Sequence, residues 1–496
     1  MRHQLSLLFT FSVLCFYFHS SAQNPAYTKT TIVTGLQYPV AFEMMPNGYF
    51  LCTQKGGNTN PAVAAQILVY NQSGTYVGIF YDLTDSVDAD FERGLLGICI
   101  DANFSTNRYV YCYYVHLWNG DQRLRVVRFT ENNYVGTNPT VIWDWDIPDN
   151  IPGNHVGGNV RMHASEPDKI YISVGDLASN QTDTVINYGH LLTVPYGKIL
   201  RLKTDGSIPT DNPFYDDGDP LTGNCDVIWT YGHRNPFDFC FSAVNDSLYS
   251  SENGLNTWDE ANQITKGNNY GWNICEGMYR NSSTSIPCNH PGFVDPMTEW
   301  GAPLGGVTGI LVYSGTVFPT LDNHMLVADN DYGRVYDCTL GNAPAYNTVT
   351  SNVYWTDLTT SGGLTTLKEG TDGCIYAMKG GYTTNGQIYR VCPQGMYVGE
   401  NKEQDYFLNA PAPNPSQDVA TLHYLLKKNA RVNISLYDIS GRKIAELVNG
   451  SKPGGEYSVQ VSATELGLDA GTYLCTMKIG ENGNEFSQTV RLAIVK

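Results

Sequence analysis

The stretch "DNHMLVADNDYGRVYDC", residues 322–338, contains two short apolar and aromatic runs separated by a turn of Asp, Asn and Gly. Such runs, bounded by turn residues, are typical of β-strands. Similar units occur at "PNGYFLCTQ" (46–54), "PDKIYISVGD" (167–176) and "TDGCIYAMKGG" (371–381). Because helical periodicity is almost absent between them, the sequence predicts an all-β fold.

The repetition of these units extends over residues 24–395. A β-propeller repeats one sheet of ~40 to 50 residues around an axis, and longer loops lengthen the unit. We therefore expect a β-propeller in this region. One or two large β-sandwiches are the alternative.

The N-terminus has the pattern of an export signal. Arg2 and His3 precede an apolar run at 5–18, and the small residues 20–22 offer a cleavage site. The apolar run is shorter than the ~20 residues that span a bilayer, and no second run approaches that length. Residues 1–22 are therefore predicted to be a signal peptide on an exported chain.

Composition restricts the classes of partner. The 496 residues are 42% hydrophobic and 16% charged, which is typical of globular proteins. The formal net charge of -18 disfavours nucleic acid, because such binding depends on clustered Lys and Arg. We expect no nucleic-acid partner.

The 12 cysteines suit an oxidising compartment. Cys15 leaves with the signal, so an odd number remains. Cys275 and Cys288 flank a polar loop and are predicted to form a disulfide. The sequence has no C-x-x-C pair, which disfavours a zinc site or a redox dithiol.

A second domain follows a polar, proline-rich linker at residues 396–407. Residues 408–496 contain strands with alternating apolar positions, which predict a small C-terminal β-sandwich. The segments "APNPS" (412–416), "LYDISGRKI" (436–444) and "VRLAIVK" (490–496) resemble the C-terminal sorting domain of the type IX secretion system. That resemblance implies contact with this secretion machinery and a secreted or outer-surface location. A sandwich that binds substrate is the alternative.

Six motifs in the first domain occur in a fixed order. They are "ERGLLGICIDANF" (92–104), "NHVGGNV" (154–160), "YISVGD" (171–176), "YGKILRL" (196–202), "YGHRNPFDF" (231–239) and "ENGLNTWDEANQITKGNNYGWN" (252–273). Together they resemble the glucose/sorbosone dehydrogenase family, soluble aldose dehydrogenases that use pyrroloquinoline quinone on a six-bladed propeller. The resemblance implies a quinone- and calcium-dependent oxidoreductase that passes electrons from a sugar to an external acceptor.

Matching positions then acquire expected roles. His155 corresponds to the general base that removes the C1 hydroxyl proton while hydride leaves for the quinone, and Asp176 to its acidic partner. Arg234 and Asn235 correspond to cofactor contacts, because a fixed guanidinium fork and an amide suit the quinone's carboxylates and carbonyls. Asn253 adjoins this expected cofactor platform.

Calcium is also implied by the resemblance. The carbonyl oxygens of Gly254 and Leu255 correspond to ligands of an ion that bridges to the cofactor, and Gly254 also belongs to the cofactor platform. Glu260 and the Tyr270 carbonyl correspond to a second, structural calcium site.

The chain departs from the family at Asn253-Gly254-Leu255, at Asn159 and, most seriously, in the segment 361–376. Where family members carry two arginines that contact the quinone, this chain has Gly363 and Thr365. Lys368 or Lys379 could replace them. The missing arginines favour one alternative, a propeller that binds glycan or protein without turnover. A calcium-dependent sugar lactonase is a second alternative, because six-bladed propellers with a central Ca²⁺ also support that reaction.

Overall fold

The computed structural model describes residues 26–57, 62–149, 151, 153–179, 181–182, 187–381, 385–394, 406–409, 411–439, 441–481 and 484–495. The predicted signal peptide (1–22) and most of the predicted linker (396–407) lie outside them. Strands dominate, and the two α-helices, α1 (Phe104–Asn107) and α2 (Ala463–Leu466), have four residues each. The all-β class is confirmed. In the described part of the chain, no helix has the length and apolar character needed to cross a membrane.

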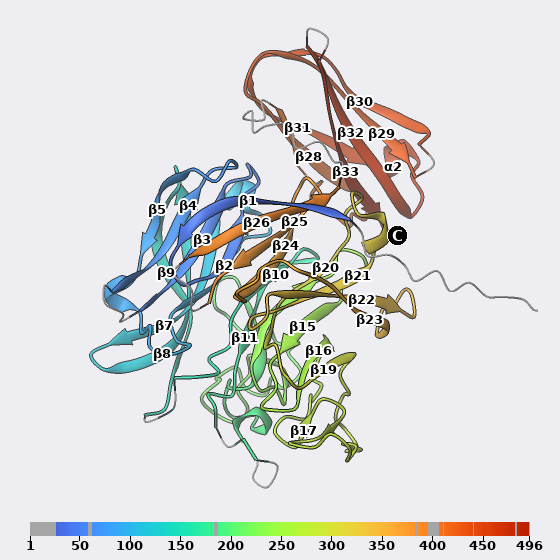
Figure 1. Cartoon of the computed structure of the whole chain (residues 1–496). Helices are drawn as coiled ribbons and strands as arrows, with labels where there is room; N and C mark the ends of the chain where they lie inside the picture. Colours follow the sequence, from blue (N-terminus) through green and yellow to red (C-terminus); the bar gives the residue numbers. More distant parts are fainter. Residues whose placement is uncertain are drawn as a thin grey trace, which may run out of the picture.

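Six four-stranded antiparallel sheets follow one another along residues 27–393 (Figure 1). The first contains β2 (Pro39–Met44), β3 (Phe50–Gly57), β4 (Val63–Tyr70) and β5 (Tyr76–Asp82); the second contains β6 (Leu95–Ile100), β7 (Tyr109–Trp118), β8 (Asp121–Asn132) and β9 (Val135–Asp146). The third contains β10 (Val160–His163), β11 (Glu166–Val174), β12 (Lys198–Lys203) and β13 (Ile228–Tyr231).

The fourth and fifth sheets also take their four strands in chain order, whereas the sixth takes its outermost strand from the N-terminal end of the described chain. The fourth contains β14 (Pro236–Phe241), β15 (Leu248–Glu252), β16 (Trp258–Ile264) and β19 (Thr298–Gly301), and the short hairpin β17 (Cys275–Glu276) and β18 (Tyr279–Arg280) precedes its last strand. The fifth contains β20 (Val307–Val312), β21 (His324–Asp329), β22 (Arg334–Gly341) and β23 (Thr348–Asp357). The sixth contains β24 (Leu364–Glu369), β25 (Ile375–Lys379), β26 (Gly386–Pro393) and, as its outermost strand, β1 (Tyr27–Leu36).

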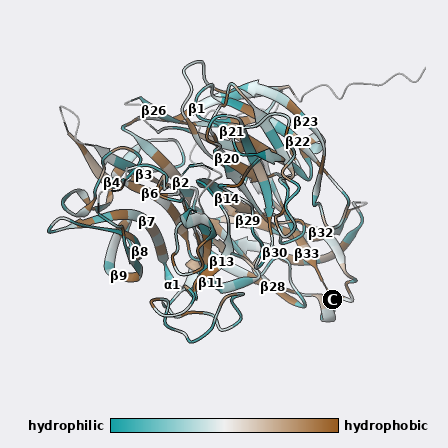
Figure 2. Ribbon diagram, turned by 90° about the horizontal axis from the view of Figure 1, so that it is seen from below, coloured by the Kyte–Doolittle hydropathy of each residue, from teal (hydrophilic) through white to brown (hydrophobic). Residues whose placement is uncertain are grey.

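The first strands of the sheets form a closed ring. In the order β2, β6, β10, β14, β20 and β24, each contacts the next, and β24 contacts β2. These strands are largely buried, and their apolar side chains pack between neighbouring sheets. Figure 2 shows hydrophobic segments mainly in the strands, whereas the long loops at the rim are hydrophilic.

The N-terminal strand closes this ring. β1 pairs antiparallel with β26, with Tyr27 opposite Pro393 and Leu36 opposite Gly386. Fully buried Val33 and Leu36 pack in one cluster with residues of the first and sixth sheets, including Phe42 and Met378. The apolar face of β1 therefore joins the two ends of the ring.

Two disulfides are present in the described residues. Cys275–Cys288 confirms the predicted pair, and Cys374–Cys392 joins the start of β25 to β26. Seven other described cysteines are free, and all but Cys240 are buried. Burial raises the pKa of their thiols, to about 12 for Cys225 and Cys475.

The C-terminal region forms a unit of two sheets. One contains β27 (Tyr406–Leu408), β28 (Val419–Leu426) and β31 (Gly455–Ser462); the other contains β30 (Lys443–Lys452), β29 (Ala430–Asp438), β32 (Gly471–Glu481) and β33 (Asn484–Ile494). Apolar residues of both sheets share one buried cluster. The unit lies beside the ring in Figure 1, and Arg491 approaches Asp322 at 3.9 Å.

Leu36→Ala should test the closing strand. Removal of this buried side chain should lower the free energy of unfolding by about 2 to 5 kcal/mol, because a cavity opens between the first and sixth sheets. Thr34→Ala, at an exposed position of the same strand, should change it by less than ~0.5 kcal/mol. Chemical denaturation measures both, and equal effects would contradict this role of β1.

Candidate active site

Most of the predicted site residues lie in loops at one end of the third and fourth sheets, whereas Glu260 lies within β16. His155 precedes β10 and Asp176 follows β11, whereas Arg234 and Asn235 precede β14 and Asn253 follows β15. Backbone hydrogen bonds join these loops: the Asp176 N–H donates to the Arg234 carbonyl at 2.7 Å, and the Leu177 N–H donates to the His155 carbonyl at 3.1 Å. The structure thus brings together residues up to about a hundred positions apart.

His155 and Asp176 form a buried pair. The Nδ1 of His155 lies 2.7 Å from Oδ1 of Asp176. A carboxylate accepts hydrogen bonds, so Nδ1 carries the hydrogen, and in the neutral imidazole the lone pair lies on Nε2. Among the described residues, Nε2 has no hydrogen-bond partner. Nε2 is therefore available as a base.

Asp176 is held by several donors. Its carboxylate, which has no exposed surface, accepts from Trp272 Nε1 at 2.8 Å, Asn187 Nδ2 at 2.9 Å, Gln181 Nε2 at 3.1 Å and the Ala178 N–H at 2.9 Å. Such bonds compensate for the loss of water around a buried carboxylate. They also fix the direction in which Asp176 holds the imidazole.

The backbone at His155 is fixed as well. Its φ of 53° lies in the left-handed region, which residues other than glycine rarely adopt. The Glu92 carboxylate accepts the His155 N–H at 2.7 Å. The next glycine, Gly157, has φ of 80°, and a Cβ there would meet the Ser173 carbonyl oxygen at 2.3 Å. The turn therefore needs glycine after His155.

Arg234 is a buried cation without an ion pair. Its guanidinium donates to the Asn253 carbonyl at 3.0 Å and to Gln181 Oε1 at 3.2 Å, and lies 5.5 Å from the centre of the Trp272 ring. Within the described part of the chain, no carboxylate lies within ion-pair distance of it. Burial lowers the pKa of Arg234, and nearby carboxylates, Asp176 first, oppose that shift. A buried unpaired guanidinium is a site for an anionic group.

Asn235 and Asn253 connect the loops. The Oδ1 of Asn235 accepts the Gly157 N–H at 3.1 Å, and its Nδ2 lies 3.5 Å from Oδ1 of Asn253. The Asn253 amide also donates to the Val307 carbonyl. Both amides therefore hold the glycine turn after His155 against the fourth and fifth sheets.

The Gly254–Leu255 segment turns its N–H groups toward acids. The Gly254 N–H donates to Asp259 at 2.9 Å, and the Leu255 N–H to Glu276 at 2.8 Å. The carbonyl oxygens of Gly254 and Leu255 accept no hydrogen bond from the described residues. Two free carbonyls on adjacent residues suit a hard cation such as Ca²⁺.

Glu276 was not predicted from the sequence. One of its oxygens accepts the N–H groups of residues 255, 256, 257 and 258 at 2.8 to 3.1 Å. An isolated Glu in "CEGMY" gives no sequence signal for this role.

Glu260 and Tyr270 lie close to a second acid. Glu260 pairs across the sheet with Glu252, and burial followed by repulsion from Glu252 raises the pKa of Glu260 to about 8. The Tyr270 ring stacks on His233, which bonds to Glu252 at 2.8 Å. A buried pair of carboxyl groups is the electrostatic setting that a structural cation would stabilise.

The positions of the absent arginines lie at the start of β24. Gly363 has φ of 91°, and Thr365 is fully buried with no hydrogen-bond partner for Oγ1 in the described residues. Lys368 pairs with Glu43 at 2.8 Å. Lys379 forms no ion pair among described residues, and its Cγ lies 3.4 Å from where a Cβ on Gly363 would stand. Lys379 is thus the available cation of the two.

Comparisons with known proteins identify a family for each of the two regions of the chain. The model of the glucose/sorbosone dehydrogenase family matches residues 36–390, and that of a secretion system C-terminal sorting domain matches residues 412–492. Quinoprotein glucose dehydrogenase B of Acinetobacter calcoaceticus is 29% identical over 55% of this chain and 57% of its own length. Aldose sugar dehydrogenase YliI of Escherichia coli is 26% identical over 59% of this chain and 75% of its own.

Solved structures show the same fold. The soluble aldose sugar dehydrogenase of E. coli, in its apo form, aligns with a TM-score of 0.62 and 22% identity over 74% of this chain and all of its own. The PQQ-bound aldose sugar dehydrogenase of Streptomyces coelicolor aligns with a TM-score of 0.56 and 21% identity over 74% of this chain and 99% of its own.

Glu276→Ala should release the loop at residues 255–258. Without the carboxylate, four N–H groups lose their acceptor, and their amide exchange should accelerate by about ten-fold or more. Glu276→Gln retains one acceptor oxygen and should show a smaller effect. Hydrogen exchange with mass spectrometry measures this, and unchanged exchange in Glu276→Ala would contradict the assignment.

Proposed function

Because the chain belongs to the glucose/sorbosone dehydrogenase family, we propose that it is an exported dehydrogenase that depends on pyrroloquinoline quinone and calcium. Its substrate is an aldose or a related alcohol, oxidised at C1, and an external acceptor receives the electrons. The His155–Asp176 pair, with Nε2 unbonded, supports this proposal most directly.

The residues present fit the quinone on one side. Arg234 supplies a buried unpaired cation for a carboxylate, and the adjacent amides of Asn235 and Asn253 shape the wall beside it. Lys379 supplies a second cation near Gly363. When bound, the quinone supplies the electron-poor carbonyl that accepts hydride.

His155 does the proton chemistry. Its Nε2 accepts the C1 hydroxyl proton, and the imidazolium that forms is stabilised by Asp176 at 2.7 Å. Because other donors already fix Asp176, the imidazole does not have to reorient during the reaction. The free carbonyls of Gly254 and Leu255 would hold a Ca²⁺ ion, and Glu260 with the Tyr270 carbonyl a second one.

We also propose that the six sheets are the blades of a six-bladed propeller over residues 24–395, followed by a small β-sandwich at 408–496. The closed order of contacts among β2, β6, β10, β14, β20 and β24 supports the propeller. The shared core of the two C-terminal sheets supports the sandwich, whose first strand begins at Tyr406.

The sorting-domain match at 412–492 indicates export to the cell surface or secretion. We propose that the type IX machinery recognises this domain. The two disulfides agree with an oxidising compartment.

A quinone titration with and without Ca²⁺ tests the cofactor and the base together. Wild type should bind quinone with Ca²⁺ and then reduce a dye with a sugar. His155→Ala should keep quinone binding and lower kcat by ~10²- to 10⁴-fold, because proton removal loses its base. His290→Ala, at an exposed position, is the matched control.

Other results would favour the alternatives. Sugar binding without any quinone binding would favour a non-catalytic propeller, as the missing arginines at Gly363 and Thr365 allow. Acid release from a lactone without an electron acceptor would favour the lactonase.

Arg234→Met should weaken quinone binding by about 10- to 100-fold, because one charge-assisted contact is lost. Lys379→Met should weaken it by a smaller factor if Lys379 replaces the missing arginines. Arg442→Met, on the surface of the C-terminal unit, should leave it unchanged. Equal affinities in wild type and Arg234→Met, measured by absorbance titration, would refute this role of Arg234.

A further inference from the structure

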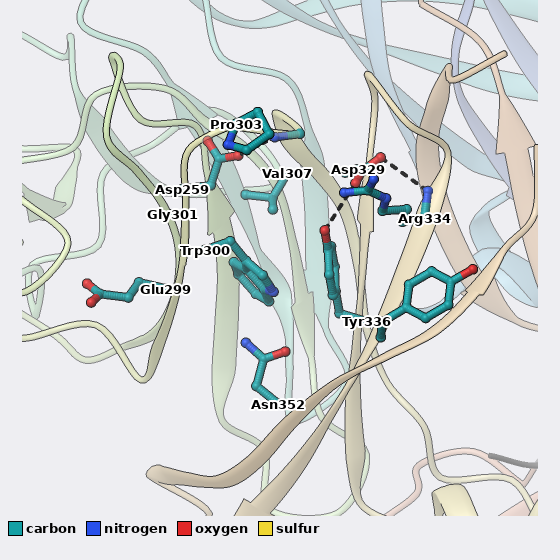
Figure 3. A pocket seen from close by; sticks show the side chains of 12 residues that line it. Asp259, Glu299, Trp300, Gly301, Pro303, Val307, Asp329, Arg334, Tyr336 and Asn352 are labelled. Atoms are coloured by element: carbon teal, nitrogen blue, oxygen red, sulfur yellow. Dashed lines mark hydrogen bonds between the residues drawn. The ribbon is translucent and has the colours of Figure 1, made fainter. Parts of the chain in front are cut away.

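A separate cavity lies between the fourth and fifth sheets. Its volume is about 400 Å³, within the ~300 to 1,000 Å³ of typical small-ligand pockets. Figure 3 shows Trp300, Tyr336 and Asn352 around its hollow, with Asp259 and Val307 at one end. Asp259 also bonds to Gly254, so the cavity and the candidate active site share a wall.

The acids of this cavity are already engaged. Asp259 accepts the N–H groups of Gly254, Gly305 and Gly306, and Asp329 accepts those of Tyr332 and Arg334. Among the described residues, no group of three potential metal ligands gathers here. A metal ion would have to displace these bonds, and the lining carboxylates outnumber the one lining cation, Arg334, which disfavours an anion.

Several polar groups remain free for a neutral ligand. Trp300 Nε1 is buried and has no hydrogen-bond partner in the described part of the chain. Asn352 donates through Nδ2 to Thr298 at 2.8 Å, which leaves its carbonyl oxygen to accept. The cavity therefore offers both donors and acceptors.

Aromatic rings form the apolar walls. Trp300 and Tyr336 lie 5.2 Å apart between ring centres at 42°, and Tyr354 is half exposed at the mouth. A pyranose ring presents a C–H face that packs on such rings, and its hydroxyls both donate and accept. We propose that this cavity is a saccharide-binding site, distinct from the His155 site, that takes a neutral pyranose unit. Saccharide binding in this cavity requires no quinone and is therefore independent of the proposed oxidation.

Calorimetric titration tests this with the chain lacking residues 1–22, without quinone or Ca²⁺. Glucose, maltose and cellobiose are the probes, and at least one should bind saturably with a Kd of about 1 mM or lower. Trp300→Phe keeps one six-membered aromatic ring and removes the indole N–H with the five-membered ring that carries it, so binding should weaken by about 3- to 10-fold. Asn352→Leu should weaken it similarly, and Trp118→Phe, at an exposed tryptophan of β7, should not.

His155→Ala separates the two sites, because binding in the cavity should survive it. The proposal fails if no probe binds saturably, or if binding is lost in His155→Ala but unchanged in Trp300→Phe and Asn352→Leu. It also fails if glucuronate or CaCl₂ competes for the same site more strongly than the sugars. Thermal unfolding of each variant confirms that a loss of binding reflects the site.

Discussion

The antiparallel pairing of β1 with β26 is the interaction on which the ring of sheets depends. Each sheet buries its first strand against the next, so the ring is stable only when the last sheet meets the first. β1 stabilises the junction of the sixth and first sheets. Its backbone completes the sixth sheet, and its Val33 and Leu36 pack against Phe42 of the first. It also covers an edge that would otherwise present unpaired backbone groups.

The positions of the candidate site residues depend on the same ring. Loops from the third and fourth sheets converge only because β10 and β14 are neighbours in the ring. Buried polar bonds then fix the loops: Asp176 collects donors from four residues besides His155, and Glu276 holds four successive amides. These buried polar groups have hydrogen-bond partners, whereas the Arg234 guanidinium has no carboxylate partner among the described residues. An anionic group of a ligand would supply that partner.

The sequence predicted the fold class well because alternation of strand and turn is a local pattern. It could not place β1 beside β26, since residues 27 and 393 carry no local signal of their pairing. Cys275–Cys288 was predictable from a short polar loop, whereas Cys374–Cys392 was not, because pairings among many cysteines are degenerate.

The candidate site likewise contains residues that the sequence indicated and residues that it did not. The resemblance of ordered motifs selected His155 and Asp176, and the structure places their side chains in contact. Glu276 and Trp300 contact residues that are distant in sequence, so the residues next to them in the chain do not distinguish them from other positions. The roles of Glu260 and Tyr270 as calcium ligands remain predictions.

The distribution of cysteines constrains the order of events during maturation. Six of the seven free thiols of the described residues are buried, five of them within strands, and their raised pKa leaves almost no reactive thiolate. Before folding, the same thiols are exposed to the oxidants that form Cys275–Cys288 and Cys374–Cys392. Correct bridges therefore require that the sheets bury the spare thiols before oxidation is complete, so the yield of correctly bridged protein depends on the relative rates of folding and disulfide formation.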